Sequence, residues 1–356
     1  MKHHLKFRMF LLLILSGLFL NCMVVIAQEE IHPDTLTFDQ QEVEGFFERD
    51  DLMNITIKFN ITEYMRKRSD EYMDAEITFY FDVDDSASYS IRLKPRGERR
   101  RQVCAFPPIR LNFKNTNTGY EDIDSMKNIK LVTHCNTPSV YDEYLLKEYL
   151  IYKMYNLVTD YSFRVRLLRV KYIDTGKKGR FYNKYGFLIE PLDLLEQRMN
   201  VMELENIPLR YSNMVPDMLD RMVIFQYMIG NTDWQLSTYH NIKIVKKIDQ
   251  QKGIPIPYDF DYAGLVNTSY AIPHEIFPID DVRQRFFMGA CRPDTVYKRI
   301  VQEFVDNKDK IYAITDSCEL LGGKSAKYIN DYLDGFFNLC DKDRIINFFK
   351  LECEDK

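Results

Sequence analysis

The chain has 356 residues, of which 46% are hydrophobic and 14% aromatic. This length and composition suffice for a substantial core, in one two-lobed unit or in two domains. The formal net charge is −5, and only one short segment is strongly basic. Because a nucleic-acid-binding surface is rich in Lys and Arg, this charge argues against nucleic acid as a partner.

Residues 1–27 have the pattern of a cleavable secretory signal peptide. A positively charged start precedes an apolar stretch at 9–20, and residues 25–27 provide a cleavage site. The alternative is a retained membrane anchor, but the apolar stretch is short for a bilayer span and is interrupted by Asn21. We therefore expect a secreted, periplasmic or extracellular protein with no stable transmembrane segment after cleavage.

The cysteine content fits an oxidising compartment. The chain has seven cysteines, and six remain once Cys22 is removed with the signal segment. An even number allows up to three disulfides, and none of the six has the CxxC spacing typical of a zinc site. Cys104 and Cys135 both flank predicted strands and are the preferred pair. Buried free thiols are the alternative.

After an acidic, weakly patterned segment at 28–51, the N-terminal half is predicted to be rich in β-structure. Alternation of apolar and polar residues predicts strands at 54–59, 76–81, 88–94, 108–113 and 126–134. Two longer strands follow at 163–173 and 180–190, and Pro191 ends the second. We expect a mostly antiparallel sheet.

A basic segment, Lys94–Arg101, lies between two of the predicted strands. A charge run of this kind is most often a solvated loop. The functional alternative is a loop that faces phosphate, because clustered guanidinium groups bind phosphate oxygens bidentately. The sequence alone leaves both interpretations open.

One helix is predicted within the N-terminal half. It begins after Ser139, and apolar residues recur at helical spacing as far as Tyr155. Glu148 falls on or near the apolar stripe of this helix. Either this carboxylate has a buried partner, for which Lys130 is the natural candidate, or its head reaches solvent at the margin of the stripe.

The C-terminal half is predicted to be mostly helical, with one β-hairpin. An apolar helix at 216–229 ends at Gly230, and the hairpin follows from 241. Further helices are predicted at 279–288, 293–307, 326–339 and 343–349. The expected fold class is therefore α+β with two lobes: a β-rich N-terminal half and a mostly helical C-terminal half. The expected boundaries are 28–115, 116–190 and 191–356.

The segment 228–264 carries the residues with the clearest chemical role. Asp233 lies in a loop after the apolar helix, Asn241 begins the hairpin, and Asp259 and Asp261 lie at its exit. Phosphoryl transfer needs an acid beside the acceptor hydroxyl, and an amide and a carboxylate that hold Mg²⁺. Ordinary turn chemistry is the alternative for each residue alone. We prefer the catalytic interpretation because apolar residues flank the acids, and carboxylates at a core edge need a compensating partner.

These and other motifs resemble the spore coat protein H (CotH) kinase-like proteins, which are secreted atypical protein kinases of the protein-kinase-like superfamily. The resemblance covers roughly residues 90–350, and its most specific part is the Asp-x-Asp-x-x-Gly at 259–264. The other matching motifs are Arg96-Gly97, Cys104-Ala-Phe-Pro-Pro, Asn128-Ile-Lys130-Leu, Leu146-Lys-Glu148, Phe187-Leu-Ile-Glu190, Asn231-Thr-Asp233 and His240-Asn241.

The resemblance implies a two-lobed protein-kinase-like fold and a phosphotransferase that uses ATP with Mg²⁺ or Mn²⁺. It implies that Asp233 is the catalytic residue. The implied metal ligands are Asn241, Asp259 and Asp261. The implied nucleotide-binding residues belong to a phosphate loop, a Lys–Glu ion pair and an adenine-facing hinge: Arg96, Lys130, Glu148, Phe187, Ile189 and Glu190.

The chain departs from the common protein-kinase pattern in two places. No glycine-rich loop is present, and Arg96-Gly97 stands in its place. Asn241 follows Asp233 by eight residues, a longer spacing than is usual. Either a small insertion widens this loop or Asn241 is not a ligand, and His240 beside it is either a substrate contact or a packed or solvated histidine.

We therefore expect a secreted phosphotransferase that binds nucleotide and acts on Ser or Thr of extracytoplasmic proteins. Transfer of another group of ATP, such as AMP, is one alternative. A catalytically inactive kinase-like module of the cell envelope is a second, and a sugar- or polymer-binding surface protein is a third. Metal-dependent binding of ATP would separate the enzymes from the binding modules.

Overall fold

The computed structural model of the chain describes residues 45–353, apart from short gaps at 83–84, 115, 118–122, 125 and 206–207. The predicted signal peptide at 1–27 and most of the acidic segment lie outside the described residues. All described helices and strands belong to the unit that begins at Gly45.

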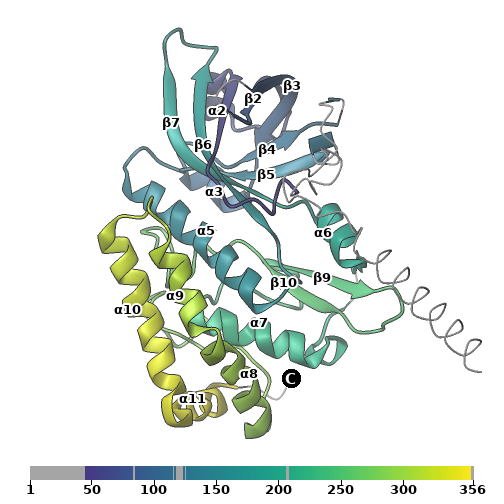
Figure 1. Cartoon of the computed structure of the whole chain (residues 1–356), viewed down its shortest axis with the longest axis vertical. Coiled ribbons are helices and arrows are strands. Elements are labelled where there is room, and N and C mark those ends of the chain that lie inside the picture. Colours follow the sequence, from purple (N-terminus) through teal and green to yellow (C-terminus); the bar gives the residue numbers. More distant parts are fainter. Residues whose placement is uncertain are drawn as a thin grey trace, which may run out of the picture. The chain divides into compact units, whose positions relative to one another are not determined.

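In the described part of the chain, seven strands form a closed barrel (Figure 1). They are β1 (Met53–Phe59), β2 (Met73–Tyr80), β3 (Ser86–Pro95), β4 (Ile109–Asn112), β5 (Asn128–Val132), β6 (Val165–Asp174) and β7 (Phe181–Ile189). They pair in the order β1-β2-β3-β4-β5-β7-β6, and every pair in this order is antiparallel. The barrel closes because β6 also pairs in parallel with β1.

Alternation along the strands fills the barrel with apolar side chains. On β1, Ile55, Ile57 and Phe59 are buried, whereas Asn54 is exposed and Lys58 half-buried. Burying a side chain of this size contributes about 1.5–3 kcal/mol. The other strands complete the same core with Ile77, Phe79, Leu93, Leu111, Leu168 and Leu188.

The predicted two-lobed protein-kinase-like fold is wrong. That fold needs an open, mostly antiparallel sheet in its first lobe, whereas the parallel pairing of β1 with β6 closes this sheet into a mixed barrel. The physical reason is that the alternation of apolar and polar residues carries only local information. It predicts a strand and its buried face, but it does not specify which distant strand pairs with its edge.

The remaining elements lie between the barrel strands or after them. Among the described residues, the helices that interrupt the strands include α2 (Ile61–Lys67), α3 (Glu98–Val103) and α5 (Val140–Val158). A second sheet has three strands: β8 (Val201–Glu203), β9 (Ile242–Lys247) and β10 (Ile254–Pro257). The later helices are α6 (Leu192–Met199), α7 (Pro216–Ile229), α8 (Asp294–Asp306), α9 (Lys308–Asp316), α10 (Gly323–Cys340) and α11 (Arg344–Glu352).

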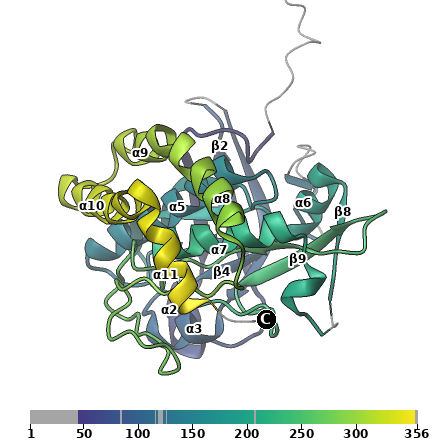
Figure 2. The ribbon, with the colours of Figure 1, turned by 90° about the horizontal axis from the view of Figure 1, so that it is seen from below.

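Helix α5 joins the barrel to the later helices. It contacts β6 and β7 on one side and α7 and α9 on another, as its position in Figure 1 shows. In Figure 2, α9, α10 and α11 gather on one side and β8 and β9 on the other. Every residue of α5 from Leu145 to Tyr152 is buried. Glu148 is therefore buried as well, which excludes the alternative with its head in solvent.

The six cysteines of the described residues form two disulfides. Cys104 is bonded to Cys135, which confirms the preferred pair. Cys291 is bonded to Cys353, while Cys318 and Cys340 are free thiols. The first bond joins the residue after α3 to the segment that leads into α5.

The predicted helix at 279–288 is wrong. The segment is irregular, and tertiary contacts take the place of helical hydrogen bonds. Arg285 donates to the Met228 carbonyl oxygen at 3.2 Å and to the Tyr332 carbonyl oxygen at 2.6 Å. Its guanidinium also lies 4.0 Å from the centre of the Tyr332 ring.

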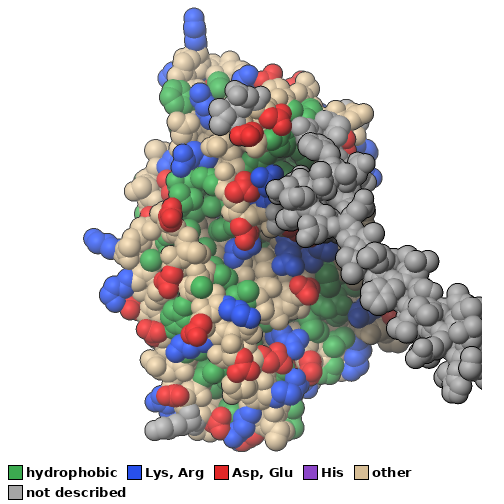
Figure 3. Space-filling view, viewed as in Figure 1, with side chains coloured by type: hydrophobic (Ala, Val, Ile, Leu, Met, Phe, Trp, Pro, Cys, Tyr) green, Lys and Arg blue, Asp and Glu red, His purple; other side chains and the backbone are tan. Residues whose placement is uncertain are grey.

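The surface mixes both signs of charge. Figure 3 shows Lys and Arg side chains interspersed with Asp and Glu over one face of the molecule. Within the described residues, no helix combines the length and the apolar character needed to cross a membrane.

Candidate functional site

The loop that carries Asp233 begins at a helix end that requires glycine. Gly230 ends α7 in the left-handed region at φ 66°. A Cβ at this position would lie 1.9 Å from the hydroxyl oxygen of Tyr332. The Gly230 carbonyl accepts the Gly264 N–H at 3.0 Å. This bond ties the loop after α7 to the turn that follows Asp261.

Replacement of Gly230 by Ala is expected to lower the free energy of unfolding by about 1–3 kcal/mol, because a left-handed backbone with a Cβ is strained. The added clash with Tyr332 acts in the same direction. Urea denaturation measures the loss. Gly323→Ala is the matched control, because a Cβ there meets nothing within 4 Å. Equal stability of the two variants would contradict the requirement for glycine at 230.

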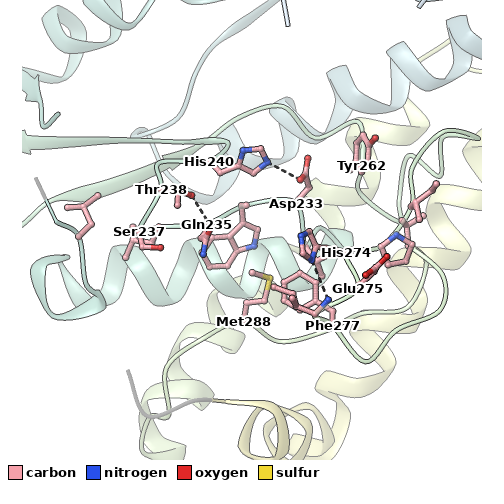
Figure 4. A pocket seen from close by; sticks show the side chains of 18 of the residues that line it. Asp233, Gln235, Ser237, Thr238, His240, Tyr262, His274, Glu275, Phe277 and Met288 are labelled. Atoms are coloured by element: carbon pink, nitrogen blue, oxygen red, sulfur yellow. Dashed lines mark hydrogen bonds and ion pairs between the residues drawn. The ribbon is translucent and has the colours of Figure 1, made fainter. Parts of the chain in front are cut away.

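Two asparagines hold Asp233 in position. The buried Asn231 accepts the Asp233 N–H on its Oδ1 at 3.0 Å. The Asn241 amide donates to the Asp233 carbonyl oxygen at 2.8 Å and to the carboxylate Oδ2 at 3.0 Å. The His240 Nε2 lies 3.0 Å from the other carboxylate oxygen, Oδ1, and the two side chains point at one another in Figure 4.

The long spacing between Asp233 and Asn241 is accommodated by a small loop. Gln235 and His240 exchange two backbone hydrogen bonds of 3.0 Å, which close residues 235–240 into a loop. Asn241 then adopts φ 54°, a left-handed value that Asn tolerates. The loop therefore brings Asn241 back to Asp233, although Asn241 follows it by eight positions in the sequence.

Asp259 and Asp261 follow β10 in a tight turn. Asp259 has φ 64°, and its N–H donates to the Tyr152 hydroxyl at 2.9 Å. Asp261 is buried, and its Oδ2 accepts the Tyr270 hydroxyl at 3.0 Å. The Asp261 carbonyl oxygen also accepts the Thr268 hydroxyl at 3.0 Å. The two carboxylates are thus fixed by contacts from both α5 and the following loop.

A single guanidinium, that of Arg100, joins three acids. Its Nη2 donates to Glu148 Oε2 at 2.9 Å and to Asp259 Oδ1 at 2.9 Å, and its Nε donates to Asp261 Oδ2 at 2.7 Å. The side chain of Arg100 is 10% exposed, that of Glu148 3% and that of Asp261 6%, whereas that of Asp259 is 31% exposed. We call these four residues the Arg100 cluster. Only Asp259 in it has substantial access to solvent.

The protonation of the Arg100 cluster follows from burial and charge. Burial raises the pKa of Glu148 to about 8, although Arg100 opposes the shift. Burial also raises the pKa of Asp261. For Asp259 burial acts upward too, but Arg100, Arg96 and Lys130 outweigh it and lower the pKa. Asp259 is therefore the carboxylate best suited to stay ionised.

The predicted Lys130–Glu148 ion pair is wrong. Glu148 pairs with Arg100 instead, and the Lys130 ammonium lies 4.4 Å from the centre of the Tyr258 ring. Burial and then the nearby Arg96 lower the pKa of Lys130 to about 7. The inference that Glu148 needs a buried cationic partner was right, but the partner comes from α3 and not from β5.

The predicted adenine-facing hinge has structural partners of its own. Phe187 is fully buried against Tyr149 and Tyr152. Ile189 is buried, and its strand β7 is paired on both sides, with β5 and β6. Glu190 is bound by Arg198 through two hydrogen bonds of 2.9 Å. None of Phe187, Ile189 and Glu190 lines either cavity that contains Asp233, so their adenine contact stays a prediction.

Two adjoining cavities meet at Asp233. The smaller, of about 400 Å³, is lined by Arg96, Arg100, Asp233, Asn241 and Asp259. The larger, of about 1120 Å³, extends from the Asp233–His240 pair to the loop 272–277 and Met288 (Figure 4). Both cavities are also lined by Arg99, His240 and Tyr262.

The residues of the smaller cavity fit a divalent cation in donor type. Asp259, Asp261 and Asn241 offer oxygen ligands, the class that Mg²⁺ prefers. The Asn241 amide nitrogen is directed at Asp233, which leaves its carbonyl oxygen for a cation. The described residues contain no group of three or more His, Cys, Asp or Glu arranged to hold a metal by themselves. A cation here would need the Asn241 oxygen or ligand oxygens in addition.

Arg100 is the site residue that the sequence did not single out. It lies in the basic segment 94–101, where Arg96 was chosen instead. The buried Glu148 was the available signal, since it demanded a cation that Lys130 does not supply. The short helix α3 turns Arg100 inward while Arg99 and Arg101 remain more exposed.

Comparisons with known proteins do not assign the chain to a family. No protein-family model and no curated protein matches the chain. Among solved structures, the Helicobacter pylori proinflammatory kinase CtkA aligns with a TM-score of 0.40 and 11% identity, covering 67% of this chain and 94% of that chain. A kinase is thus a weak structural neighbour, and a similarity at this level carries no argument about activity. Membership of the CotH kinase-like proteins stays a prediction.

Proposed function

We propose that the chain is an ATP-dependent phosphotransferase that acts on Ser or Thr of proteins outside the cytoplasm. One observation carries this proposal. The smaller cavity brings Arg96 and Arg100 together with Asp233, Asn241 and Asp259, and it shares Asp233 with a second, larger cavity. A phosphate-binding side, an acid and an acceptor side are the parts that phosphoryl transfer requires.

Arg96 supplies the phosphate contact in this proposal. In the described part of the chain, the Arg96 side chain has no ion pair within 4 Å. It lines the smaller cavity and lies close enough to Asp259 to lower the pKa of that carboxylate. An unpaired guanidinium binds phosphate oxygens with two parallel hydrogen bonds. Lys130 is close enough to Arg96 for the charge of Arg96 to lower the pKa of Lys130.

Asp233 takes the acceptor proton. Each of its carboxylate oxygens has one partner, so further lone pairs stay available for an acceptor hydroxyl. In the transfer step the acceptor oxygen bonds to the terminal phosphorus of ATP, and the bond from that phosphorus to its bridging oxygen breaks. The hydroxyl proton passes to Asp233, and ADP leaves with the bridging oxygen.

Asp259, Asp261 and Asn241 would hold Mg²⁺ or Mn²⁺ through their oxygen atoms. When bound, the ion neutralises phosphate charge and orients the phosphate chain. Asp259 is the principal ligand in this proposal because it is both the most exposed and the most readily ionised acid of the Arg100 cluster. The protein fixes this carboxylate through the Tyr152 contact to its backbone.

The larger cavity is the acceptor side. Its volume of about 1120 Å³ exceeds the size typical of a small-molecule site. Exposed Ile272 and Ile276 flank it, and Trp234 and Met288 contribute apolar walls. A protein segment with apolar side chains next to its Ser or Thr suits such a lining. The predicted signal segment at 1–27 supports a location outside the cytoplasm.

The first test is nucleotide binding. We expect ATP with Mg²⁺ or Mn²⁺ to raise the thermal unfolding midpoint of the chain from Gln28 onward, because a ligand that binds only the folded state stabilises it. The gain is about 2.7 kcal/mol at a hundred times the dissociation constant. Asp259→Ala should abolish the metal-dependent gain, and Asp331→Ala on the exposed face of α10 should keep it. No shift at millimolar ATP with either ion would overturn the proposal.

The Arg100 cluster favours a second candidate function. Its guanidinium already binds Asp259 and Asp261, so the carboxylates have a cation without any metal. This arrangement suits a catalytically inactive module that serves as an interaction protein of the envelope. Such a module binds no ATP in the thermal test. If ATP binds and is turned over, the mass of the modified acceptor distinguishes a phosphoryl from an AMP group.

A further inference from the structure

The Arg100 guanidinium occupies the position between Asp259 and Asp261 that a metal ion bound by both carboxylates would need. It donates to one oxygen of each carboxylate, at 2.9 Å and 2.7 Å. Both distances are those of strong charge-assisted hydrogen bonds. A divalent cation that bound these two oxygens would lose binding energy by displacing the guanidinium from them.

Within the Arg100 cluster, three acids share the single positive charge of Arg100. Within the described residues, the second oxygen of Glu148 is buried with no hydrogen-bond partner. A buried acceptor without a partner is costly. The cluster is thus attractive to a further cation, while its present cation occupies the ligand oxygens.

Arg100 is held in this place by the anchoring of α3. The Cys104–Cys135 disulfide follows the helix directly. Arg68 donates to the Arg101 carbonyl oxygen at 2.8 Å and to the Gln102 carbonyl oxygen at 2.9 Å, which fixes the last turn. Displacement of the Arg100 side chain therefore needs only side-chain rotation. Arg100 and Arg96 both line the smaller cavity, so an anionic ligand bound there is within reach of either side chain.

We propose that Arg100 competes with a divalent cation for Asp259 and Asp261, so that cation binding is weak until an anionic ligand in the smaller cavity accepts the displaced guanidinium. The inference rests on the proposed metal ligands. It deepens the proposed function by making cation binding and nucleotide binding mutually strengthening. Linkage requires the coupling to be reciprocal: nucleotide tightens the cation by the same factor by which the cation tightens nucleotide.

The test measures Mn²⁺ binding by paramagnetic resonance, without nucleotide, for the native chain and for Arg100→Gln. We expect Arg100→Gln to bind Mn²⁺ roughly tenfold more tightly or better, because the cation no longer displaces a charged hydrogen-bond donor. Arg99→Gln is the matched control. It removes the same charge from the same helix and from the lining of the smaller cavity, but Arg99 forms no ion pair with the three acids in the described structure.

A second arm adds a non-hydrolysable ATP analogue. The native chain should then bind Mn²⁺ more tightly, whereas Arg100→Gln should gain less from the analogue. Mn²⁺ that binds Arg100→Gln no more tightly than the native chain, or that tightens equally in Arg99→Gln, would overturn the inference. If the analogue binds neither protein, the proposed function fails while the first arm still decides the competition.

A folding control keeps the test decisive. If Arg100→Gln does not fold without a cation, Arg100→Lys takes its place. Lysine keeps the charge but loses the planar fork that spans three carboxylates. We expect Arg100→Lys to bind Mn²⁺ with an affinity above that of the native chain, and an affinity at or below the native value would contradict the competition.

Discussion

Replacing Asp233 by Asn is expected to slow phosphoryl transfer by about 10²–10⁴-fold, the usual effect of losing a general base. The amide keeps the shape of the side chain, but it cannot take the acceptor proton. Nucleotide binding should be retained because Asp233 faces the acceptor side and Arg96 is untouched. The measurement is single-turnover transfer of labelled terminal phosphate from ATP to dephosphorylated casein or to the chain itself.

The control for this variant is Asp331→Asn, which changes an exposed carboxylate of α10 whose partner is Lys327 one turn away. Its transfer rate should equal that of the native chain. Thermal unfolding of both variants checks that the fold is intact. If Asp233→Asn loses nucleotide binding together with transfer, Asp233 has no separate role as the proton acceptor.

Replacing Arg100 by Gln is expected to lower the free energy of unfolding by about 3–5 kcal/mol when divalent cations are chelated. Removing one partner of a buried ion pair leaves the others without compensation, and here three carboxylates depend on one guanidinium. Two of these acids are almost completely buried. Urea denaturation in the presence of a chelator measures the loss.

Arg99→Gln again provides the comparison. Arg99 is exposed, and its guanidinium lies 5.4 Å from the centre of the Tyr262 ring. Its replacement should change the free energy of unfolding by no more than about 0.5 kcal/mol, as for most surface substitutions. If Arg100→Gln and Arg99→Gln have the same unfolding midpoint, the ion pairs of the Arg100 cluster do not stabilise the fold.

Local patterns in the sequence predict most of the secondary structure. The helix at 216–229 has the predicted ends because proline at its start and glycine after its end are both local signals. The long strands at 163–173 and 180–190 also differ only slightly from β6 and β7. Barrel closure could not be predicted, because it depends on pairing between β1 and β6, which lie more than a hundred residues apart.

The candidate site was also predicted only in part, because local turns can be recognised in the sequence whereas distant packing cannot. Asp233, Asn241 and Asp259 lie in one segment whose turns are recognisable from the sequence, and they line one cavity. The partner of Glu148 comes from a distant six-residue helix, so its identity depends on tertiary packing. Three neighbouring arginines, 99 to 101, are chemically alike in the sequence, and only the direction of the α3 backbone selects Arg100.

The disulfide between Cys104 and Cys135 has a consequence for how the protein matures. It links the end of α3, which presents Arg100, to the segment that enters α5, which presents Glu148. A covalent link of this kind persists in an oxidising compartment and is reduced in the cytosol. If the predicted signal peptide at 1–27 directs export, the chain lacks this bond when it is made and forms it after leaving the cytosol. Synthesis and full assembly of the site would then be separated in time and in place.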